Sequence, residues 1–158
     1  GDNAWATASG DNTPSFFAYL SASWAITSEE VHVEIPFDTE VFDSDSCYNT
    51  STYRFTPTTA GKYLVYSNVT IMAATQETLY RAMVQIRKNG GEQSISNVDH
   101  RGYAFFGATI PATWVVDMNG SSDYLSMYAF YDTASGEASV IRSTQGYSGW
   151  GAFKIGNT

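Results

Sequence analysis

Apolar and polar side chains alternate with a period of two along most of the chain, which is the pattern of half-buried β-strands. Turn-forming residues interrupt this alternation at short intervals, and no helical periodicity of useful length is visible. About ten short strands without helices predict an all-β sandwich, for which a jelly roll is the expected topology in a chain of 158 residues. The predicted strands are Phe16–Ser21, Val31–Phe37, Tyr53–Thr56, Lys62–Ala73, Leu79–Arg87, Ser94–Val98, Ala104–Ile110, Trp114–Met118, Tyr124–Tyr131, Ala138–Arg142 and Tyr147–Ile155.

Several segments are predicted to lie between or outside these strands. Asn89-Gly90-Gly91 and Asn119-Gly120 are predicted to form hairpin-type turns, because Asn and Gly tolerate positive φ. Pro111 is expected to break or end a strand, or to lie on a sheet edge. Residues 1–14 are small and polar apart from Trp5 and read as an N-terminal arm or linker, whereas 15–158 form one domain. Thr133–Gln145 is expected to be a long loop that carries a short strand.

The predicted strand Lys62–Ala73 is unusual because both of its faces are partly apolar. One face carries Tyr63, Val65, Ser67, Val69 and Ile71, which suits a sandwich core. The other carries Leu64, Tyr66, Asn68, Thr70 and Met72, a mixture of apolar and polar groups. Either a local loop covers this second face or another protein chain does.

Composition narrows the function classes. Charged residues make up 15% of the chain, aromatic residues also 15%, and the formal net charge is −8. Eight scattered Lys and Arg residues argue against nucleic acid and anionic membranes as partners. No apolar run approaches the roughly 18 to 20 residues of a membrane span, so no membrane insertion is expected. The single cysteine, Cys47, excludes an internal disulfide framework, which is compatible with cytosolic assembly, including assembly of a virion.

An aromatic residue, an aspartate, two further aromatic residues and a Gly-x-Tyr motif follow one another at the positions Phe37, Asp43, Tyr48, Phe55, Gly61 and Tyr63. This spacing resembles the signature of the C1q globular domain. Val65 and Ser67 depart from that signature, and this stretch is more similar to the tumour-necrosis-factor branch, with Gly-x-Tyr-Leu-x-Tyr-Ser. Near the C-terminus, Tyr147 and Gly149 fit the closing strand of the family. The amino-acid sequences of the segments NTPSFFAYL, EVFDSDSCY and FTPTTAGKY also resemble C1q-type domains of phage structural proteins.

This resemblance implies a homotrimeric C1q/TNF-like jelly roll, in which copies of the chain cover the second face of Lys62–Ala73. It assigns Leu64, Tyr66, Asn68 and Met72 to the trimer interface, with Tyr66 near the threefold axis. The implied function is a non-enzymatic virion component, such as a fibre tip or capsid-surface protein, that binds a host receptor or glycan. Residues 1–14 would then contact other virion proteins. A secreted C1q-like recognition or signalling domain of a cellular organism is the alternative, and a polysaccharide depolymerase on the same scaffold is a third hypothesis.

Candidate ligand-binding residues are Asp99, Arg101 and Tyr103, a set able to hydrogen-bond a sugar while an aromatic face stacks on it. The competing interpretation is that Arg101 only pairs with Asp99 on a solvated turn. No G-x-S-x-G motif or other catalytic constellation stands out, so no catalytic residue is assigned.

A group of carboxylates, Asp38, Glu40, Asp43 and Asp45, is a weak calcium candidate. The spacing is not that of an EF-hand, and a solvated acidic surface loop is the favoured interpretation. No cofactor or metal is therefore assigned.

Overall fold

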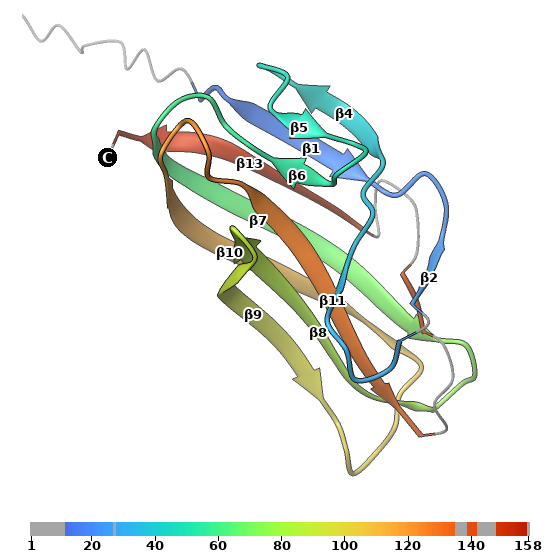
Figure 1. The fold of residues 1–158 in the computed structure, drawn as a ribbon. Helices are drawn as coiled ribbons and strands as arrows, with labels where there is room; N and C mark the ends of the chain where they lie inside the picture. The colour runs from blue at the N-terminus through green and yellow to red at the C-terminus, as the bar shows by residue number, and fades with distance from the viewer. Residues whose placement is uncertain (1–11, 27, 135–138, 142–147, 158) are drawn as a thin grey trace, which may run out of the picture.

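The computed structural model describes residues 12–26, 28–134, 139–141 and 148–157. Thirteen strands in this part of the chain form two antiparallel sheets that face one another, as the sequence predicts for a jelly-roll sandwich (Figure 1). The sequence predicts about ten strands, and the additional ones are short or occupy segments expected to be loops.

The first sheet, called sheet A, is built around the long strand β7 (Gly61–Ala73). β10 (Gly107–Met118) pairs with β7 along one side, from Gly107 opposite Met72 to Met118 opposite Gly61. On the other side β7 pairs with β13 (Gly149–Gly156) and β12 (Ser139–Ile141). β1 (Ser15–Tyr19) and β4 (Thr39–Asp43) extend the sheet beyond β13, and β2 (Trp24–Ile26) pairs with β12.

The second sheet, sheet B, has β11 (Leu125–Thr133) at its centre. β8 (Leu79–Lys88) pairs with one side of β11, and β9 (Gly91–Asp99) is the strand beyond β8. β3 (Val33–Glu34) and β6 (Arg54–Phe55) pair with the other side, and β5 (Tyr48–Asn49) pairs with β6.

An aromatic cluster fills one end of the core between the sheets. The ring of Phe16 stacks on Tyr48 at 4.6 Å and on Phe55 at 4.5 Å, and it meets the edge of Trp150 at 4.7 Å. Burying such large side chains supplies much of the hydrophobic stabilisation of the fold. The aromatic signature positions lie in this core: Phe37, Tyr48, Phe55 and Tyr63 are 5% exposed or less. Tyr147 lies outside the described residues.

Close backbone packing explains the signature position Gly61, and hydrogen bonding explains Asp43. A Cβ on Gly61 would lie 2.5 Å from the carbonyl oxygen of Gly156, so only glycine fits where β7 begins beside β13. Asp43 accepts hydrogen bonds from the backbone N–H groups of Cys47 at 3.0 Å and Tyr48 at 2.8 Å. These signature positions therefore have structural roles.

Two predicted strands, Ala104–Ile110 and Trp114–Met118, are one continuous strand, β10, that passes through Pro111. Pro111 is opposite Asn68 of β7, and within the described residues β10 has no other partner strand in sheet A. The missing N–H of proline therefore removes no ladder hydrogen bond, because it faces the free edge. The expectation that Pro111 lies on an edge is confirmed, and the expectation of two separate strands is wrong.

The prediction that Asp38–Asp45 is a surface loop is also wrong, because Thr39–Asp43 forms β4, paired with β1. The segment Thr39-Glu40-Val41-Phe42-Asp43 lacks a clear burial pattern, since Val41 is 49% and Phe42 is 47% exposed. The predicted strand Val31–Phe37 is paired only at Val33–Glu34, and β2 and β5 were not predicted.

The hairpin turn at Asn89-Gly90 is confirmed by positive φ angles of 52° and 79°. It is tied to the neighbouring turn by Asp123, whose carboxylate accepts hydrogen bonds from Asn89 Nδ2 at 2.8 Å and Asn119 N at 2.9 Å. Lys88 Nζ lies 2.8 Å from the same carboxylate. Burial works against ionisation of Asp123, but these hydrogen bonds outweigh it, and its pKa is lowered. In the described part of the chain, no helix is long and apolar enough to cross a membrane.

Candidate functional site

The outer face of sheet A is the surface that the sequence assigns to a partner. Along β7, Tyr63, Val65, Val69 and Ile71 are fully buried, and Ser67 is 7% exposed. The alternate residues point out of the sandwich, and Leu64, Tyr66, Asn68 and Met72 remain partly or fully exposed. The predicted alternation of the two faces is thus confirmed at these positions, whereas Thr70, which the sequence also assigns to the second face, is only 7% exposed.

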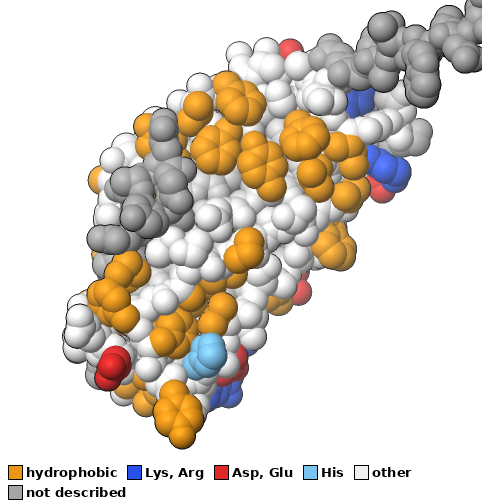
Figure 2. All heavy atoms as spheres, turned by 180° about the vertical axis from the view of Figure 1, so that it is seen from behind, with side chains coloured by type: hydrophobic (Ala, Val, Ile, Leu, Met, Phe, Trp, Pro, Cys, Tyr) orange, Lys and Arg blue, Asp and Glu red, His pale blue; other side chains and the backbone are white. Residues whose placement is uncertain are grey.

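Neighbouring strands extend this surface well beyond β7. In the register of sheet A, Phe153 lies opposite Leu64 on one side and Val115 lies opposite Leu64 on the other. Figure 2 shows apolar side chains gathered across this side of the molecule. We call this surface the apolar face; it consists of Phe17, Tyr19, Phe42, Leu64, Tyr66, Met72, Val115, Phe153 and Ile155.

Sequence reasoning found only the β7 part of the apolar face. The signal for the rest is the period-two alternation of β1 and β13, in which Phe17 and Phe153 alternate with the core residues Phe16 and Ala152. The alternation alone does not show that these side chains form one surface. The strand register shows it, because Phe17 and Tyr66 both lie opposite Gly151.

The centre of the apolar face is a row of aromatic rings. Tyr66 lies nearly parallel to Phe17, with ring centroids 6.1 Å apart, and its centroid is 6.2 Å from that of Phe153. The ring of Tyr66 reaches over Gly151, where a Cβ would lie 2.6 Å from the tyrosine hydroxyl. Burial raises the pKa of Tyr66. The glycine thus lets the tyrosine lie flat and present a broad surface.

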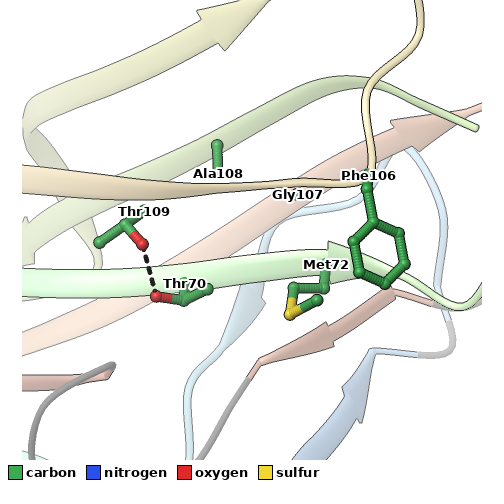
Figure 3. A pocket seen from close by; sticks show the side chains of 6 residues that line it. All are labelled: Thr70, Met72, Phe106, Gly107, Ala108 and Thr109. Atoms are coloured by element: carbon green, nitrogen blue, oxygen red, sulfur yellow. Dashed lines mark hydrogen bonds between the residues drawn. The ribbon is translucent and has the colours of Figure 1, made fainter. Parts of the chain in front are cut away.

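A pocket of about 190 Å³ lies at one end of this surface, between β7 and the start of β10 (Figure 3). Met72 and Phe106 form its apolar wall, and the hydroxyls of Thr70 and Thr109 form a 2.8 Å hydrogen bond with each other. Gly107 lies opposite Met72, whose Cγ would be 2.8 Å from a Cβ at that position. The polar groups in this pocket are thus already paired, and the rest of its lining is available for apolar contact.

A larger pocket of about 320 Å³ lies where the apolar face reaches β10, and it is lined by Leu64, Thr113, Trp114 and Val115. Trp114 is on the inward-facing side of its strand, opposite Val65, but it is 47% exposed because β10 is the edge of sheet A. An exposed tryptophan beside an unpaired strand edge is a second apolar surface, distinct from the centre of the apolar face.

The predicted ligand-binding residues Asp99, Arg101 and Tyr103 lie together at one end of the sandwich. Asp99 is the last residue of β9, whereas Arg101 and Tyr103 belong to the following turn. Arg101 Nε is 3.3 Å from the Asp99 carboxylate, and Arg81 Nε is 3.9 Å from it. Tyr103 is 89% exposed, the most exposed large apolar side chain in the described part of the protein.

The structure shows the ion pair at this turn, and a role of the turn in ligand binding stays a prediction. The ion pair of Arg101 with Asp99 exists, as the simpler interpretation requires. That pair leaves the ring of Tyr103 fully available, because the backbone N–H of Tyr103 is fixed by the His100 carbonyl at 2.8 Å while its side chain projects outward.

The carboxylates proposed as a weak calcium candidate do not gather into a site. Asp38 accepts hydrogen bonds from Ser21 N at 2.7 Å and Ser21 Oγ at 2.6 Å, and Asp43 holds the turn before β5. Glu40 and Asp45 are exposed. Across the described ranges, no group of three or more His, Cys, Asp or Glu side chains is arranged to hold a metal ion.

Comparison with solved structures identifies the fold. The globular domain of zebrafish complement 1qA protein superposes with a TM-score of 0.62 at 11% identity, covering 92% of this chain and 99% of that one. Murine APRIL gives a TM-score of 0.61 at 11% identity, with 89% and 98% covered. Eiger TNF from S. frugiperda gives 0.58 at 12% identity, with 91% and 92% covered. The sequence matches no protein-family model and none of the curated proteins with which it was compared.

The protein is therefore an all-β domain with the C1q/TNF-like jelly-roll fold, as the spacing of its signature residues predicts. At 10–12% identity the likeness establishes the fold and nothing finer.

Proposed function

We propose that the domain is a non-enzymatic homotrimeric binding module, in which two further copies of the chain cover the apolar face. The main support for this proposal is the breadth of the apolar face, which lies outside the hydrophobic core between the two sheets. Contiguous exposed apolar surfaces of this kind mark interfaces in soluble proteins. Phe42, Val115 and Ile155 on this face are each nearly half exposed, which leaves them available to a partner chain.

A closed ring of three copies needs two different patches on each chain, because every copy contacts one neighbour with each patch. The aromatic row around Tyr66 is one candidate patch, and the β10 edge with Trp114 is the other. Such an obligate interface is expected to bury on the order of 2,000 Å² or more per pair of copies. The ion pair of Lys62 with Asp117 lies at the end of this face, next to Leu64 and Val115, where the rim of an interface commonly carries charges.

The proposed ligand contact is the turn with Asp99, Arg101 and Tyr103. It lies at the end of the sandwich, away from the centre of the apolar face, so assembly and ligand binding do not compete. A protruding tyrosine beside a charged pair offers a stacking surface together with hydrogen-bond donors and acceptors, which suits a sugar or a receptor surface.

We place this module in a phage virion, as a fibre tip or capsid-surface protein for host attachment, with residues 1–14 joining it to other virion proteins. The support is the resemblance of its segments to phage C1q-type domains. Asn12 already contacts the domain, since its carbonyl accepts a hydrogen bond from Lys154 N at 3.2 Å. A secreted recognition domain of a cellular organism is the second candidate, supported by the animal proteins that share the fold.

Size-exclusion chromatography with light scattering tests the assembly. The expected mass is three times the chain mass of 17.3 kDa at micromolar concentration. A stable monomer under these conditions would refute the proposal. Binding of the intact trimer to host cells and to arrayed glycans then tests the recognition role.

A further inference from the structure

The pocket of about 320 Å³ where the apolar face reaches β10 is a place for one large apolar side chain. Three of its four lining residues are apolar, namely Leu64, Trp114 and Val115, and the fourth is Thr113. Trp114 is 47% and Val115 is 48% exposed. Covering such side chains removes apolar surface from water, so an apolar occupant of this pocket would stabilise the domain.

The described part of the chain begins at the same end of sheet A as this pocket. The carbonyl oxygen of Asn12 accepts a hydrogen bond of 3.2 Å from the backbone N–H of Lys154 in β13. Lys154 is opposite Tyr63 of β7, and Tyr63 is opposite Val116 of β10, the neighbour of Val115. Three inter-strand steps, or about 15 Å, therefore separate Asn12 from the β10 side of the pocket.

Residues 1–11, which precede the described part of the chain, are long enough to cover that distance. Seven residue steps join Trp5 to Asn12. An extended chain spans about 3.3 to 3.6 Å per residue, so these steps reach up to about 23 to 25 Å. The excess over the direct path lets the chain pass across the side chains of β13 and β7.

The composition of this arm singles out one residue as its anchor. Its sequence is GDNAWATASGD, in which Trp5 is the one large apolar side chain. The small and polar residues around Trp5 bury too little apolar surface to offset the entropy of ordering the arm. An indole offers a large contact area and can stack on the ring of Trp114, and its N–H can donate to the hydroxyl of Thr113.

The charges along the path are complementary. Asp2 and Asp11 are the charged side chains of the arm, and it has no Lys or Arg. The basic groups at this end of sheet A are Lys62, at the start of β7, and Lys154, for which the described residues provide no ion pair within 4.0 Å. An acidic arm is therefore attracted to this end of the sheet.

We propose that residues 1–11 dock on the apolar face of their own chain, with the indole of Trp5 in the pocket formed by Leu64, Thr113, Trp114 and Val115. Because Asn12 tethers the arm, the effective concentration of Trp5 at the pocket is on the order of millimolar. A contact that would be weak between separate molecules is therefore sufficient. The pocket of the same chain is within reach whatever the assembly is.

This docking goes beyond the proposed trimer and does not depend on it. The pocket is two residues along β7 and β10 from the exposed ion pair of Lys62 with Asp117, at the end of the apolar face. The centre of that face is the aromatic row around Tyr66, which the docked arm leaves uncovered. Attachment to other virion proteins through the arm would use the residues that remain outside the pocket.

Fluorine NMR of the full chain labelled with 5-fluorotryptophan tests the docking. The chain has four tryptophans, Trp5, Trp24, Trp114 and Trp150, and each gives one signal. Trp5→Ala should move the Trp114 signal by more than its line width, because the ring that covers Trp114 is removed, and should leave those of Trp24 and Trp150 in place. Thr7→Ala, in the same arm, is the matched control and should move none of them. All proteins are compared at a concentration at which light scattering gives them the same mass.

Cross-linking shows which chain supplies the pocket. Ala6→Cys combined with Asp117→Cys, on the β10 side of the pocket, should be joined by a short bis-maleimide into a product of single-chain mass, 17.3 kDa plus the linker. Adding Trp5→Ala should lower the yield at least about fivefold, because loss of the anchor lowers the effective concentration of the arm at the pocket. The control pair is Ala6→Cys with Asn97→Cys, an exposed position on the outer face of sheet B, and its yield should be low with or without Trp5.

Each of three results would overturn the proposal. The first is a Trp114 signal that does not move in Trp5→Ala, and the second is an equal cross-linking yield with and without Trp5. The third is a product formed mainly between chains, which would place Trp5 on a neighbouring copy. Because the mass from light scattering reports the trimer separately, failure of the docking and failure of the proposed assembly are distinguishable.

Discussion

Tyr66 lies over Gly151 on the outer face of sheet A, so closely that a Cβ on the glycine would be 2.6 Å from the tyrosine hydroxyl oxygen. The same Cβ would lie 2.5 Å from the carbonyl oxygen of Phe16. Gly151 of β13 therefore sets the position of the Tyr66 ring on β7, which lies near the proposed threefold axis. A change at Gly151 is therefore expected to affect both local packing and the proposed assembly.

Replacement of Gly151 by Ala is expected to displace Tyr66 and weaken the trimer. The added methyl group should lower the unfolding free energy by about 1 to 3 kcal/mol through overpacking, and the trimer should dissociate at higher protein concentration than the wild type. Gly156→Ala in the same strand is the matched control, because a Cβ there meets nothing within 4 Å. Thermal melts and light scattering measure both effects.

A double-mutant cycle shows whether the effect passes through the tyrosine. If it does, Gly151→Ala costs less in a Tyr66→Ala background than in the wild type, with a coupling of about 0.5 kcal/mol or more. Strict additivity would mean that the clash with the Phe16 carbonyl alone accounts for the loss.

Tyr66→Asp is expected to abolish assembly. Three carboxylates would come together near the threefold axis in an apolar surrounding, where like charges repel and are poorly solvated. Tyr66→Phe keeps the ring and removes only the hydroxyl, so it should remain trimeric. Light scattering at micromolar concentration compares the two, and a trimeric Tyr66→Asp protein would show that the axis runs elsewhere.

Calcium is expected to stabilise the domain little. Asp38 and Asp43 already accept hydrogen bonds from protein groups, and the four candidate carboxylates do not gather in the described structure. Thermal melts at about 10 μM calcium and with a chelator should have the same midpoint, because only a tight native-state ligand stabilises at such concentrations. A rise of many degrees would contradict this expectation.

Asp123→Asn is expected to destabilise the fold at neutral pH by about 1.5 to 3 kcal/mol, through loss of charge-assisted hydrogen bonds to Lys88, Asn89 and Asn119. The folded-state pKa of Asp123 is lowered, so its stabilising contribution is present above the unfolded-state pKa near 3.8 and is lost as the pH falls through the folded-state pKa. Denaturant unfolding of both proteins should therefore differ at pH 7 and converge in acid. Asp117→Asn, at an exposed ion pair with Lys62, should change stability far less.

The fold was predictable from sequence because its strongest signals are local. Period-two alternation gave β7 and both of its faces, and Asn89-Gly90 gave the hairpin between β8 and β9. The resemblance added the order of strands around Phe37, Gly61 and Tyr63, which alternation alone does not determine.

The surfaces were less predictable because they are assembled by register. Phe17, Tyr66 and Phe153 come from three strands far apart in the sequence, and only the pairing of β1, β13 and β7 brings their rings together. On sheet B, Arg54 and Arg87 likewise lie on either side of Ser126 only because β11 pairs with both β6 and β8. Edge strands such as β4 were missed because neither of their faces is clearly buried.

The final prediction concerns recognition at the end of the sandwich. Alanine at Asp99, Arg101 and Tyr103 together is expected to abolish binding to the host cell or glycan while leaving the trimer intact, because these side chains lie outside the core and the apolar face. Tyr103 should carry most of the effect: its ring is 89% exposed and loses no intramolecular contact on binding, whereas Arg101 already pairs with Asp99. Tyr103→Ala alone should then lower affinity about tenfold or more, as removal of a central aromatic contact commonly does. Gln76→Ala, at an exposed position in the loop between β7 and β8, is the control. Unchanged binding by a well-folded triple variant would eliminate this site and favour the interpretation of a solvated ion pair.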